Sequence, residues 1–408
     1  MTVTALARWA AEGPHADDTD RALARRALRD TVAVAVAADG DALIPLTRHL
    51  GPAGRLAAIG HALDFDDLHM ESTTHVSVVC VSAALAAPGP AERAERAYLA
   101  GAGIMARIGA ALGWEHYSSG WHATCTAGAL GAAAAAAVKA GLCTEGVERA
   151  LALAVPAAGG VQRAFGTAGK ALQVGFAADA GLRAAALAAD GATADPATVD
   201  QWLCLVSGEP SVPNTEPMGT APGAPAVPGG LAIKMYPCCY AMQRPISAVL
   251  ELAADPALVE SVTVRTPGCT LQPLIHHRPG TGLEGKFSLE YAVAAALLDG
   301  RPGFSSFTDT AVRRPEARRL VESVHTETMP GSGGLLEGDV TVEAVLRGGA
   351  VRTAVLDLPP GAPGRPPTDT ELRAKLTDCA PGLAAELAAL TWEEAEAFVA
   401  RHLPATTT

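Results

Sequence analysis

A segment rich in proline and glycine, residues 209–230, divides this 408-residue chain into two parts of different character. It reads EPSVPNTEPMGTAPGAPAVPGG, and proline and glycine at this density interrupt helices and strands alike. Before it, apolar residues recur at the three-to-four spacing of helices; after it, runs that alternate between apolar and polar residues also occur. One core rarely serves a chain of this length. The sequence therefore predicts two domains with a boundary in this segment.

The part before the boundary is predicted to be helical. The helical spacing extends from about residue 5 to residue 189, most clearly in 18–38, 90–112 and 128–142, and strand signals there are few. Residues 128–137 are almost entirely alanine and glycine, whose small side chains let neighbouring helices approach closely. We therefore expect this segment to lie in the middle of a helical bundle.

The part after the boundary combines strands with helices. Alternating, β-branched runs predict strands in 259–268 and 338–361, and the glycine pair 348–349 is typical of a hairpin turn. A second stretch rich in proline and glycine, 358–370, precedes closing helices that we expect to return to the first domain. The predicted fold is mainly α, with a large all-helical domain (1–229 and 366–408) and a smaller α+β domain (230–365).

Charge and composition argue against several classes of protein. The 31 basic and 43 acidic residues give a net charge of −12, which disfavours a nucleic acid or an anionic membrane surface as partner. The N-terminal residues lack the basic start and the apolar stretch of a signal peptide, so none is predicted. The alanine-rich run 128–140 is too short and too weakly apolar to predict a membrane span. The eight cysteines form no Cys-x-x-Cys motif, which favours free thiols. We expect a cytoplasmic protein.

Titratable side chains are dense between residues 60 and 77, in the sequence GHALDFDDLHMESTTHVS. The run contains four acids and three histidines: Asp64, Asp66, Asp67, Glu71, His61, His69 and His75. Such a density beside apolar helices is typical of acid/base chemistry. These residue types can also bind a metal, but neither a His-x-x-x-His pair nor an Asp-x-Asp-x-Asp-Gly calcium loop is present, so we predict no metal site.

Lysine is scarce in this chain, and three of the five lysines lie in glycine-rich or proline-bounded segments: Lys170 in FGTAGKALQVG, Lys234 in GGLAIKMYPCCY and Lys286 in GTGLEGKFSLEY. Each could pair with a carboxylate or, if desolvated, move a proton; a solvated cation is an equal alternative. His122 precedes a predicted helix start, where the helix dipole favours an anion, and a structural histidine is the alternative. No dinucleotide motif, phosphate loop or serine-hydrolase elbow occurs.

A set of five blocks carries more information than any single motif. The blocks are HALDFDDLH…THVS, GWHATCTAGALGAAAAAA, AGGVQRAFGTAGKALQVGFAA, KMYPCCYAMQRPISA and GTGLEGKFSLEYAVAAALLDG. In this order, over nearly the whole chain, the set resembles the MmgE/PrpD family, which includes 2-methylcitrate dehydratase, cis-aconitate decarboxylase and iminodisuccinate epimerase. The resemblance implies an enzyme without metal or cofactor, usually a homodimer. Its site is expected between a helical domain, completed by the C-terminus, and an α+β lid domain.

The resemblance also implies roles for six residues when they are carried over by position: catalysis by Asp64, His75, His122 and Lys170, and substrate binding by Lys234 and Tyr291. His75 and Lys170 would be the acid/base pair near the reacting carbon. His122 and Lys234 would hold carboxylates, and Tyr291 would donate a hydrogen bond or a proton. Asp64 would orient and tune a cationic neighbour.

This chain departs from the family pattern at three positions. Val76 stands where proline is usual, Leu68 where several relatives have threonine, and Lys286 where the better-known members differ. Leu68 lacks a hydroxyl that could hold a carboxylate, so the substrate of those members is not carried over. The leading prediction is a lyase that eliminates water from a hydroxylated di- or tricarboxylate by proton abstraction α to a carboxylate. An epimerase or isomerase and then a decarboxylase are alternatives, and a non-enzymatic helical binding protein is least favoured.

Overall fold

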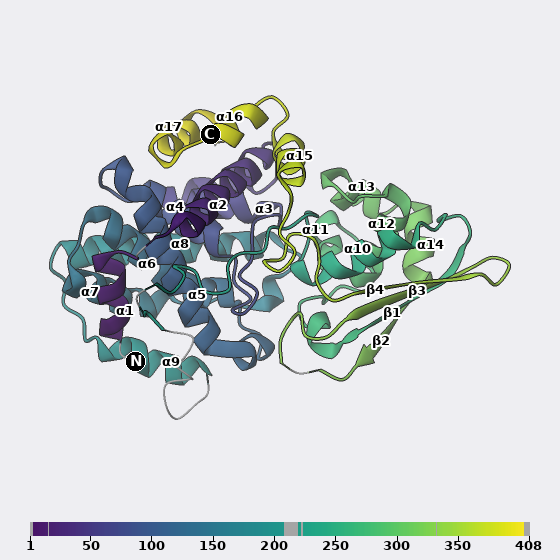
Figure 1. Ribbon diagram of the computed structural model, residues 1–408, viewed down its shortest axis with the longest axis horizontal. Helices are drawn as coiled ribbons and strands as arrows, with labels where there is room; N and C mark the ends of the chain where they lie inside the picture. The colour runs from purple at the N-terminus through teal and green to yellow at the C-terminus, as the bar shows by residue number, and fades with distance from the viewer. Residues whose placement is uncertain (1–2, 15, 208–218, 222, 332, 404–408) are drawn as a thin grey trace.

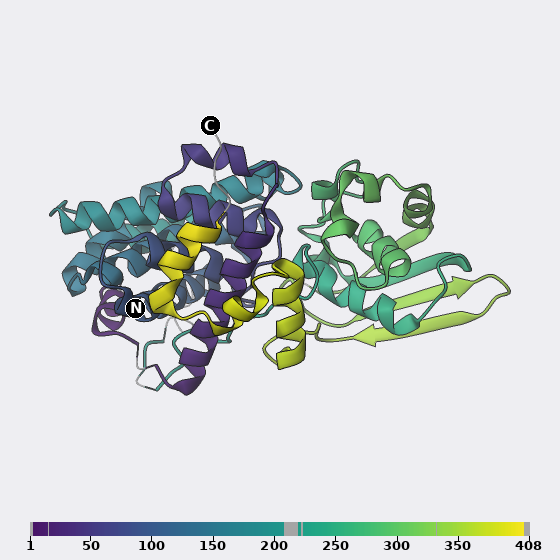
Figure 2. The same ribbon diagram turned by 90° about the horizontal axis from the view of Figure 1, so that it is seen from above.

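Two lobes lie side by side in the computed structural model (Figures 1 and 2). The structure describes residues 3–14, 16–207, 219–221, 223–331 and 333–403. Within these residues one lobe is built of helices, and the other combines helices with a four-stranded sheet. The predicted fold class, mainly α with a smaller α+β domain, is confirmed. Half of the predicted boundary segment, residues 209–218 and 222, lies outside the described residues.

The helical domain is assembled from both ends of the chain. Its α-helices are α1 (Val3–Glu12), α2 (Asp18–Ala37), α3 (Pro52–Ala62), α4 (Val76–Ala86), α5 (Ala94–Ser118), α6 (Ala123–Ala140), α7 (Thr144–Ala154), α8 (Ala168–Ala189), α9 (Ala197–Ser207), α15 (Asp369–Cys379), α16 (Ala384–Ala389) and α17 (Trp392–His402). All three C-terminal helices contact α2. Figure 1 shows α16 and α17 in yellow beside α2 and away from the sheet.

Helix α6 occupies the centre of the helical domain, packed against α4, α5, α7 and α8. Its small side chains permit this close packing: a Cβ atom added to Gly131 would lie 2.7 Å from the Cβ atom of Met105 on α5. By length and composition alone α6 could cross a membrane, but nearly all of it is buried inside the protein. It is therefore the core helix that the run of alanine and glycine predicted.

The lid domain places helices over one face of a mixed sheet (Figure 1). Its strands are β1 (Val259–Pro267), β2 (Val324–Met329), β3 (Val340–Leu346) and β4 (Val351–Leu356), and its α-helices are α10 (Gln243–Leu252), α11 (Gly282–Gly285), α12 (Leu289–Asp299), α13 (Asp309–Val312) and α14 (Pro315–Ser323). The strand order is β2-β1-β3-β4, with β1 parallel to β2 and the other pairs antiparallel. Buried and less buried residues alternate along β3, so one face of the sheet packs on the helices.

The expected β-hairpin forms, whereas one strand was not predicted. Gly348 and Gly349 have φ angles of +90° and +83° in the turn between β3 and β4, a conformation that glycine adopts without strain. Strand β2, with the sequence VHTETM, lies at the edge of the sheet, and only Val324 in it is buried. An edge strand needs little apolar alternation, so its sequence carries no clear strand signal.

Both chain connections between the domains pass beside the loop that follows α3. Leu68 in this loop and Ala232 on the way into the lid exchange two backbone hydrogen bonds of 2.9 and 2.8 Å. The neighbouring Ile233 donates its N–H to the carbonyl of Gly361 on the return path, at 2.9 Å. Gly361 has a φ of +90°, and a Cβ atom there would lie 1.9 Å from the carbonyl oxygen of Ile233, so glycine is required. The loop after α3 therefore lies at the domain junction.

Candidate active site

The loop between α3 and α4 carries acidic side chains to the domain junction. His61 lies in the last turn of α3, and His75 is the N-cap residue of α4, so both ends of the loop are fixed to helices. Asp64 has a φ of +52°, in the left-handed region that aspartate tolerates better than most residues. Asp66 points toward the two histidines, whereas the neighbouring Asp67 turns away and accepts hydrogen bonds from the start of α4. Asp66 and Asp67 are adjacent in the chain but therefore lie in different environments.

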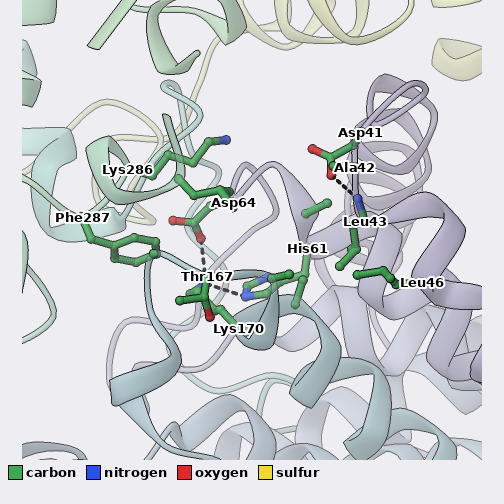
Figure 3. A pocket seen from close by; sticks show the side chains of 15 residues that line it. Asp41, Ala42, Leu43, Leu46, His61, Asp64, Thr167, Lys170, Lys286 and Phe287 are labelled. Atoms are coloured by element: carbon green, nitrogen blue, oxygen red, sulfur yellow. Dashed lines mark hydrogen bonds and ion pairs between the residues drawn. The ribbon is translucent and has the colours of Figure 1, made fainter. Parts of the chain in front are cut away.

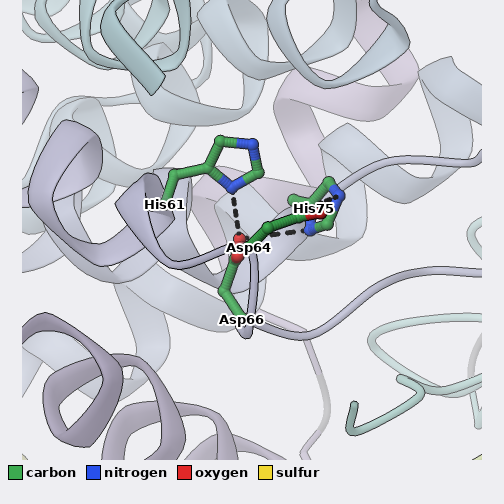
Figure 4. Close-up of side chains that lie close together, drawn as sticks. All are labelled: His61, Asp64, Asp66 and His75. Carbon is green, nitrogen blue, oxygen red and sulfur yellow. Dashed lines mark hydrogen bonds and ion pairs between the residues drawn. The ribbon is translucent and has the colours of Figure 1, made fainter. Parts of the chain in front are cut away.

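Asp66 orients the two histidines (Figure 4). Its Oδ2 atom accepts a hydrogen bond from Nδ1 of His61 at 2.8 Å and lies 3.1 Å from Nδ1 of His75. The two rings meet edge to face with their centroids 4.6 Å apart. A carboxylate at Nδ1 favours the tautomer that keeps the proton there, which leaves Nε2 of each neutral ring as a proton acceptor.

Asp64 gathers two lysines from different domains. Its Oδ1 atom lies 3.0 Å from Nζ of Lys170, in the first turn of α8, and 2.8 Å from Nζ of Lys234, where the chain enters the lid. Lys234 also donates to the backbone carbonyl of Asp64 at 2.9 Å. Nζ of Lys170 lies 2.5 Å from Nε2 of His61, and Nε2 of His75 is 3.9 Å from Asp64 Oδ1. One cluster therefore connects both histidines, both aspartates and both lysines.

His122 adds a third imidazole to the same region. It is the N-cap residue of α6, and its ring centroid lies 6.1 Å from that of His61. The side-chain amide of Gln173 donates to its Nδ1 atom at 2.6 Å, with Phe165 packed edge to face at 5.0 Å. Because Nδ1 accepts this hydrogen bond, the proton of the neutral ring lies on Nε2. His122 can therefore donate a hydrogen bond from Nε2.

Burial and charge set the protonation states of the cluster. Burial alone would raise the pKa of Asp64, but the amino groups of Lys170 and Lys234 outweigh it and hold that pKa well below its usual value. Burial lowers the pKa of His75 to about 3, although Asp66 opposes the shift. Burial, together with the nearby Lys170 amino group, holds the pKa of His122 well below its usual value. The cluster at neutral pH thus combines charged aspartates with neutral imidazoles.

Two adjoining cavities meet at this cluster. The larger, of about 150 Å³, is lined by residues of α3, α8 and the lid, among them His61, Asp64, Lys170, Lys286 and Phe287 (Figure 3). The smaller has only about 20 Å³, and its lining includes His75, His122, Cys239 and Tyr240. Asp64, Lys170 and Phe287 line both cavities. The smaller space holds no more than a water molecule or two, so a substrate there requires the lid to shift.

Comparison with known proteins identifies the family. The MmgE/PrpD N-terminal domain model matches residues 52–203, and the MmgE/PrpD C-terminal domain model matches residues 236–400. The chain belongs to the MmgE/PrpD family. A cis-aconitate decarboxylase-like protein of Aspergillus oryzae, oryM, is 26% identical to it over 371 residues, which cover 82% of this chain and 76% of the relative. Human cis-aconitate decarboxylase is 27% identical over 292 residues, 68% of this chain and 59% of the human protein. The family and these relatives support an enzyme of the lyase type.

The structure brings together five of the six residues that the family resemblance implied: Asp64, His75, His122, Lys170 and Lys234. Tyr291 does not join them. Its side chain is fully buried on α12 inside the lid core, its hydroxyl donates to the carbonyl of Ser306, and it lines neither cavity. Tyr291 packs the lid beside Phe307. Its role in substrate binding stays a prediction.

Sequence reasoning assigned no role to two members of the cluster, His61 and Asp66. Both lie in the run of titratable residues, but their positions in the sequence do not show which acids turn inward. The spacing of five from His61 to Asp66 across the end of α3 is the only signal, and it is weak. Cys239 and Phe287 were also unassigned; they reach the cavities from the lid.

The cluster contains metal-ligand types but is already paired internally. Ligand atoms of His61, Asp64, Asp66 and His75 all lie within 4.8 Å of one another. A dication between them would displace the hydrogen bond from His61 to Asp66 and would face the Lys170 amino group on Asp64. Asp64 Oδ2 and Asp66 Oδ1 have no hydrogen-bond partner among the described residues, but the two lysine amino groups on Asp64 disfavour a further cation. The absence of a metal ion from this cluster remains a prediction.

Proposed function

We propose that this protein is a lyase that removes a proton from the carbon next to a carboxylate of a small hydroxylated di- or tricarboxylic acid and eliminates water. The observation that carries the proposal is the convergence of a neutral imidazole, His75, and two lysine amino groups, Lys170 and Lys234, around Asp64 at the domain junction. A buried base next to fixed cations is what the abstraction of such a proton requires.

His75 is the base in this proposal. Its Nε2 atom makes no hydrogen bond among the described residues and lies 3.9 Å from Asp64 Oδ1, and the residue lines the smaller cavity. The low pKa of His75 by itself would leave this residue a weak base. A substrate carboxylate bound beside it adds negative charge, which favours the imidazolium and raises that pKa towards neutrality. The site thus becomes basic when the anionic substrate is present.

Lys170 is the acid. As the α-proton passes to His75, the electrons of the C–H bond form the double bond and the C–O bond breaks. The departing hydroxide takes a proton from the Lys170 ammonium group and leaves as water, and the imidazolium later returns its proton to the lysine through solvent. Negative charge that develops on the substrate carboxylate is stabilised by the Nε2–H of His122, which lines the smaller cavity, and at longer range by the charge of Lys234, which lies behind Asp64.

Loss of CO2 is a second candidate, supported by the two relatives, whose names describe cis-aconitate decarboxylases. Here the C–C bond to the departing carboxylate breaks, its electrons remain on the carbon, and Lys170 supplies the proton that replaces CO2. The same cations would stabilise the same type of anion. The two reactions differ in whether a proton is removed or added at the reacting carbon.

Proton NMR in D2O separates these reactions. The purified protein would be incubated with methylcitrate, citrate, cis-aconitate and hydroxylated or aminated succinates. A new vinyl signal with loss of the adjacent C–H signal supports the dehydratase; release of CO2 with one deuterium incorporated supports the decarboxylase. Exchange of deuterium into an intact skeleton would instead show an epimerase. His75→Gln should abolish the reaction, while His277→Gln, at a side chain 79% exposed on the lid, should not. No reaction with any of these acids would contradict the proposal.

A further inference from the structure

The larger cavity contains a lysine that the proposed mechanism does not use. Lys286 follows α11 in the lid and lines this cavity together with Leu283 and Phe287. The opposite wall comes from the helical domain and includes Lys170 and Asp41. Figure 3 shows Lys286 above Asp64, extending toward the side of the pocket where Asp41 lies. Two lysines from different domains thus face one small space.

Lys286 is buried without a carboxylate partner. Its residue is 5% exposed, and its Nζ atom donates to the backbone carbonyl of Leu63, immediately before Asp64. Among the described residues no carboxylate lies within ion-pair distance of this amino group, whereas Lys170 and Lys234 both contact Asp64. An ammonium group has three N–H donors, so two of them remain for a ligand in the cavity. Burying a charged group without a partner is costly, so a nine-tenths buried ammonium group with free N–H donors favours the binding of an anion.

The electrostatics around Lys286 agree with this geometry. Burial lowers the pKa of Lys286 to about 8, because Asp64 and Asp41 compensate only part of the cost of burying its charge. Lys234 adds to the lowering by like-charge repulsion. A carboxylate at the amino group would supply the missing compensation and would restore the charged form.

We propose that Lys286 binds a second carboxylate of the substrate, so that this protein acts on acids with one carboxylate at the reacting carbon and another that extends into the larger cavity. This inference rests on the proposed function. Because Asp64, Lys170 and Phe287 line both cavities, one ligand can extend from His75 to Lys286 past these three side chains. Apart from Asp41, His61 and Thr167 the remaining wall is apolar, with Ala42, Leu43 and Leu46 among its residues, so a single charged group of the ligand is expected there. The lid thereby selects diacids over monoacids.

Binding of unreactive acids tests the inference separately from catalysis. Isothermal titration at pH 7 would compare the diacids succinate and glutarate and the triacid tricarballylate with the monoacid butyrate. In Lys286→Met the dissociation constants of the di- and triacids should rise tenfold or more, while that of butyrate should change little. Lys286→Arg keeps a cation and should recover part of the loss. Arg278→Met removes one positive charge from an exposed position of the lid and is the matched control.

The outcomes separate the two proposals. Selective weakening of di- and triacids supports the subsite at Lys286. An equal loss for butyrate, no loss for any acid, or failure of the wild-type protein to bind any di- or triacid overturns it. The proposed function is judged on the wild-type protein by the NMR experiment above. A wild-type protein that reacts while Lys286→Met binds succinate normally would therefore retain the function and exclude the subsite.

Discussion

Lys375, on the C-terminal helix α15, donates a hydrogen bond of 2.8 Å to the backbone carbonyl of Phe65, 310 residues earlier in the chain. Phe65 separates the two acids of the site, Asp64 and Asp66. The same amino group lies 2.7 Å from Asp30 on α2, and all three residues are buried. The C-terminal helix α15 therefore holds the loop between α3 and α4 against the helical domain, and it has a direct structural role at the candidate site.

Lys375→Met should destabilise the protein by roughly 3 kcal/mol, because it leaves Asp30 and the Phe65 carbonyl buried without their partner. Burial raises the pKa of Asp30 even with the lysine beside it, so this carboxyl has no other strong compensation. Urea unfolding at pH 7, followed by circular dichroism, measures the loss. Lys139→Met is the matched control: Lys139 is buried too, but its partner Glu396 is 43% exposed and can be solvated, so a loss of about 1 kcal/mol or less is expected. Equal losses would contradict the role of Lys375.

Asp66→Asn should reduce kcat by about a hundredfold or more, since one carboxylate oxygen contacts both His61 and His75 and an amide cannot fix both tautomers. KM should change less, because Asp66 is not expected to touch the substrate. Asp67→Asn is the control at the adjacent position. Its carboxyl bonds to Ser77 instead of the histidines, and burial raises its pKa to about 7, so it is already partly neutral. Comparable kcat losses in the two variants would show that Asp66 does not position the imidazoles.

The sequence predicted most of this site because its signals were local. Asp64 and His75 lie in one dense run of titratable residues, and His122 and Lys170 stand at helix starts that the glycine pattern marks. Their convergence is tertiary: α3, α4, α6 and α8 pack together, which no single segment reveals. The family resemblance supplied that information as an expectation, and the geometry now shows the contacts.

Other features could not be predicted, for specific physical reasons. Asp64, just before Asp66 and Asp67, has a left-handed backbone and contacts Lys170 of α8 and Lys234 of the lid, so the path of the loop depends on parts of the chain far away in sequence. Tyr291 was carried over by position, but on α12 its ring fills the lid core, where Gly285 leaves room for it. The pairing of Lys375 with Asp30 spans nearly the whole chain, and no local pattern encodes it.

Removal of metal ions should leave activity unchanged. The amino groups of Lys170 and Lys234 already compensate the charge of Asp64 in the cluster of four ligand-type residues, so a further cation there would meet like charge. Dialysis against EDTA, followed by the NMR assay and elemental analysis, checks this. A rate that falls on dialysis and recovers with an added divalent ion would show that the activity depends on a metal. His75→Gln would then also lose the bound metal.

The pH dependence of stability should carry the signature of His75. Its pKa is about 3 in the folded protein and about 6.5 in the unfolded chain, so below pH 6.5 the unfolded state takes up a proton that the folded state does not. The contribution of the neutral His75 to stability is therefore complete above pH 6.5. It is lost as the pH falls below this value, by up to about 1.4 kcal/mol per pH unit. Between pH 7.5 and pH 5, the free energy of unfolding should therefore fall by about 2 kcal/mol less in His75→Gln than in the wild type.

Urea unfolding at a series of pH values measures this difference. Asp67, whose raised pKa of about 7 acts in the opposite direction, is present in both proteins and cancels in the comparison. His277→Gln is the control, because its exposed ring should follow the wild-type profile. Parallel profiles for His75→Gln and the wild type would mean that His75 takes up its proton in the folded protein near its ordinary pKa, and the assignment of a neutral imidazole to the site at neutral pH would then lose its physical basis.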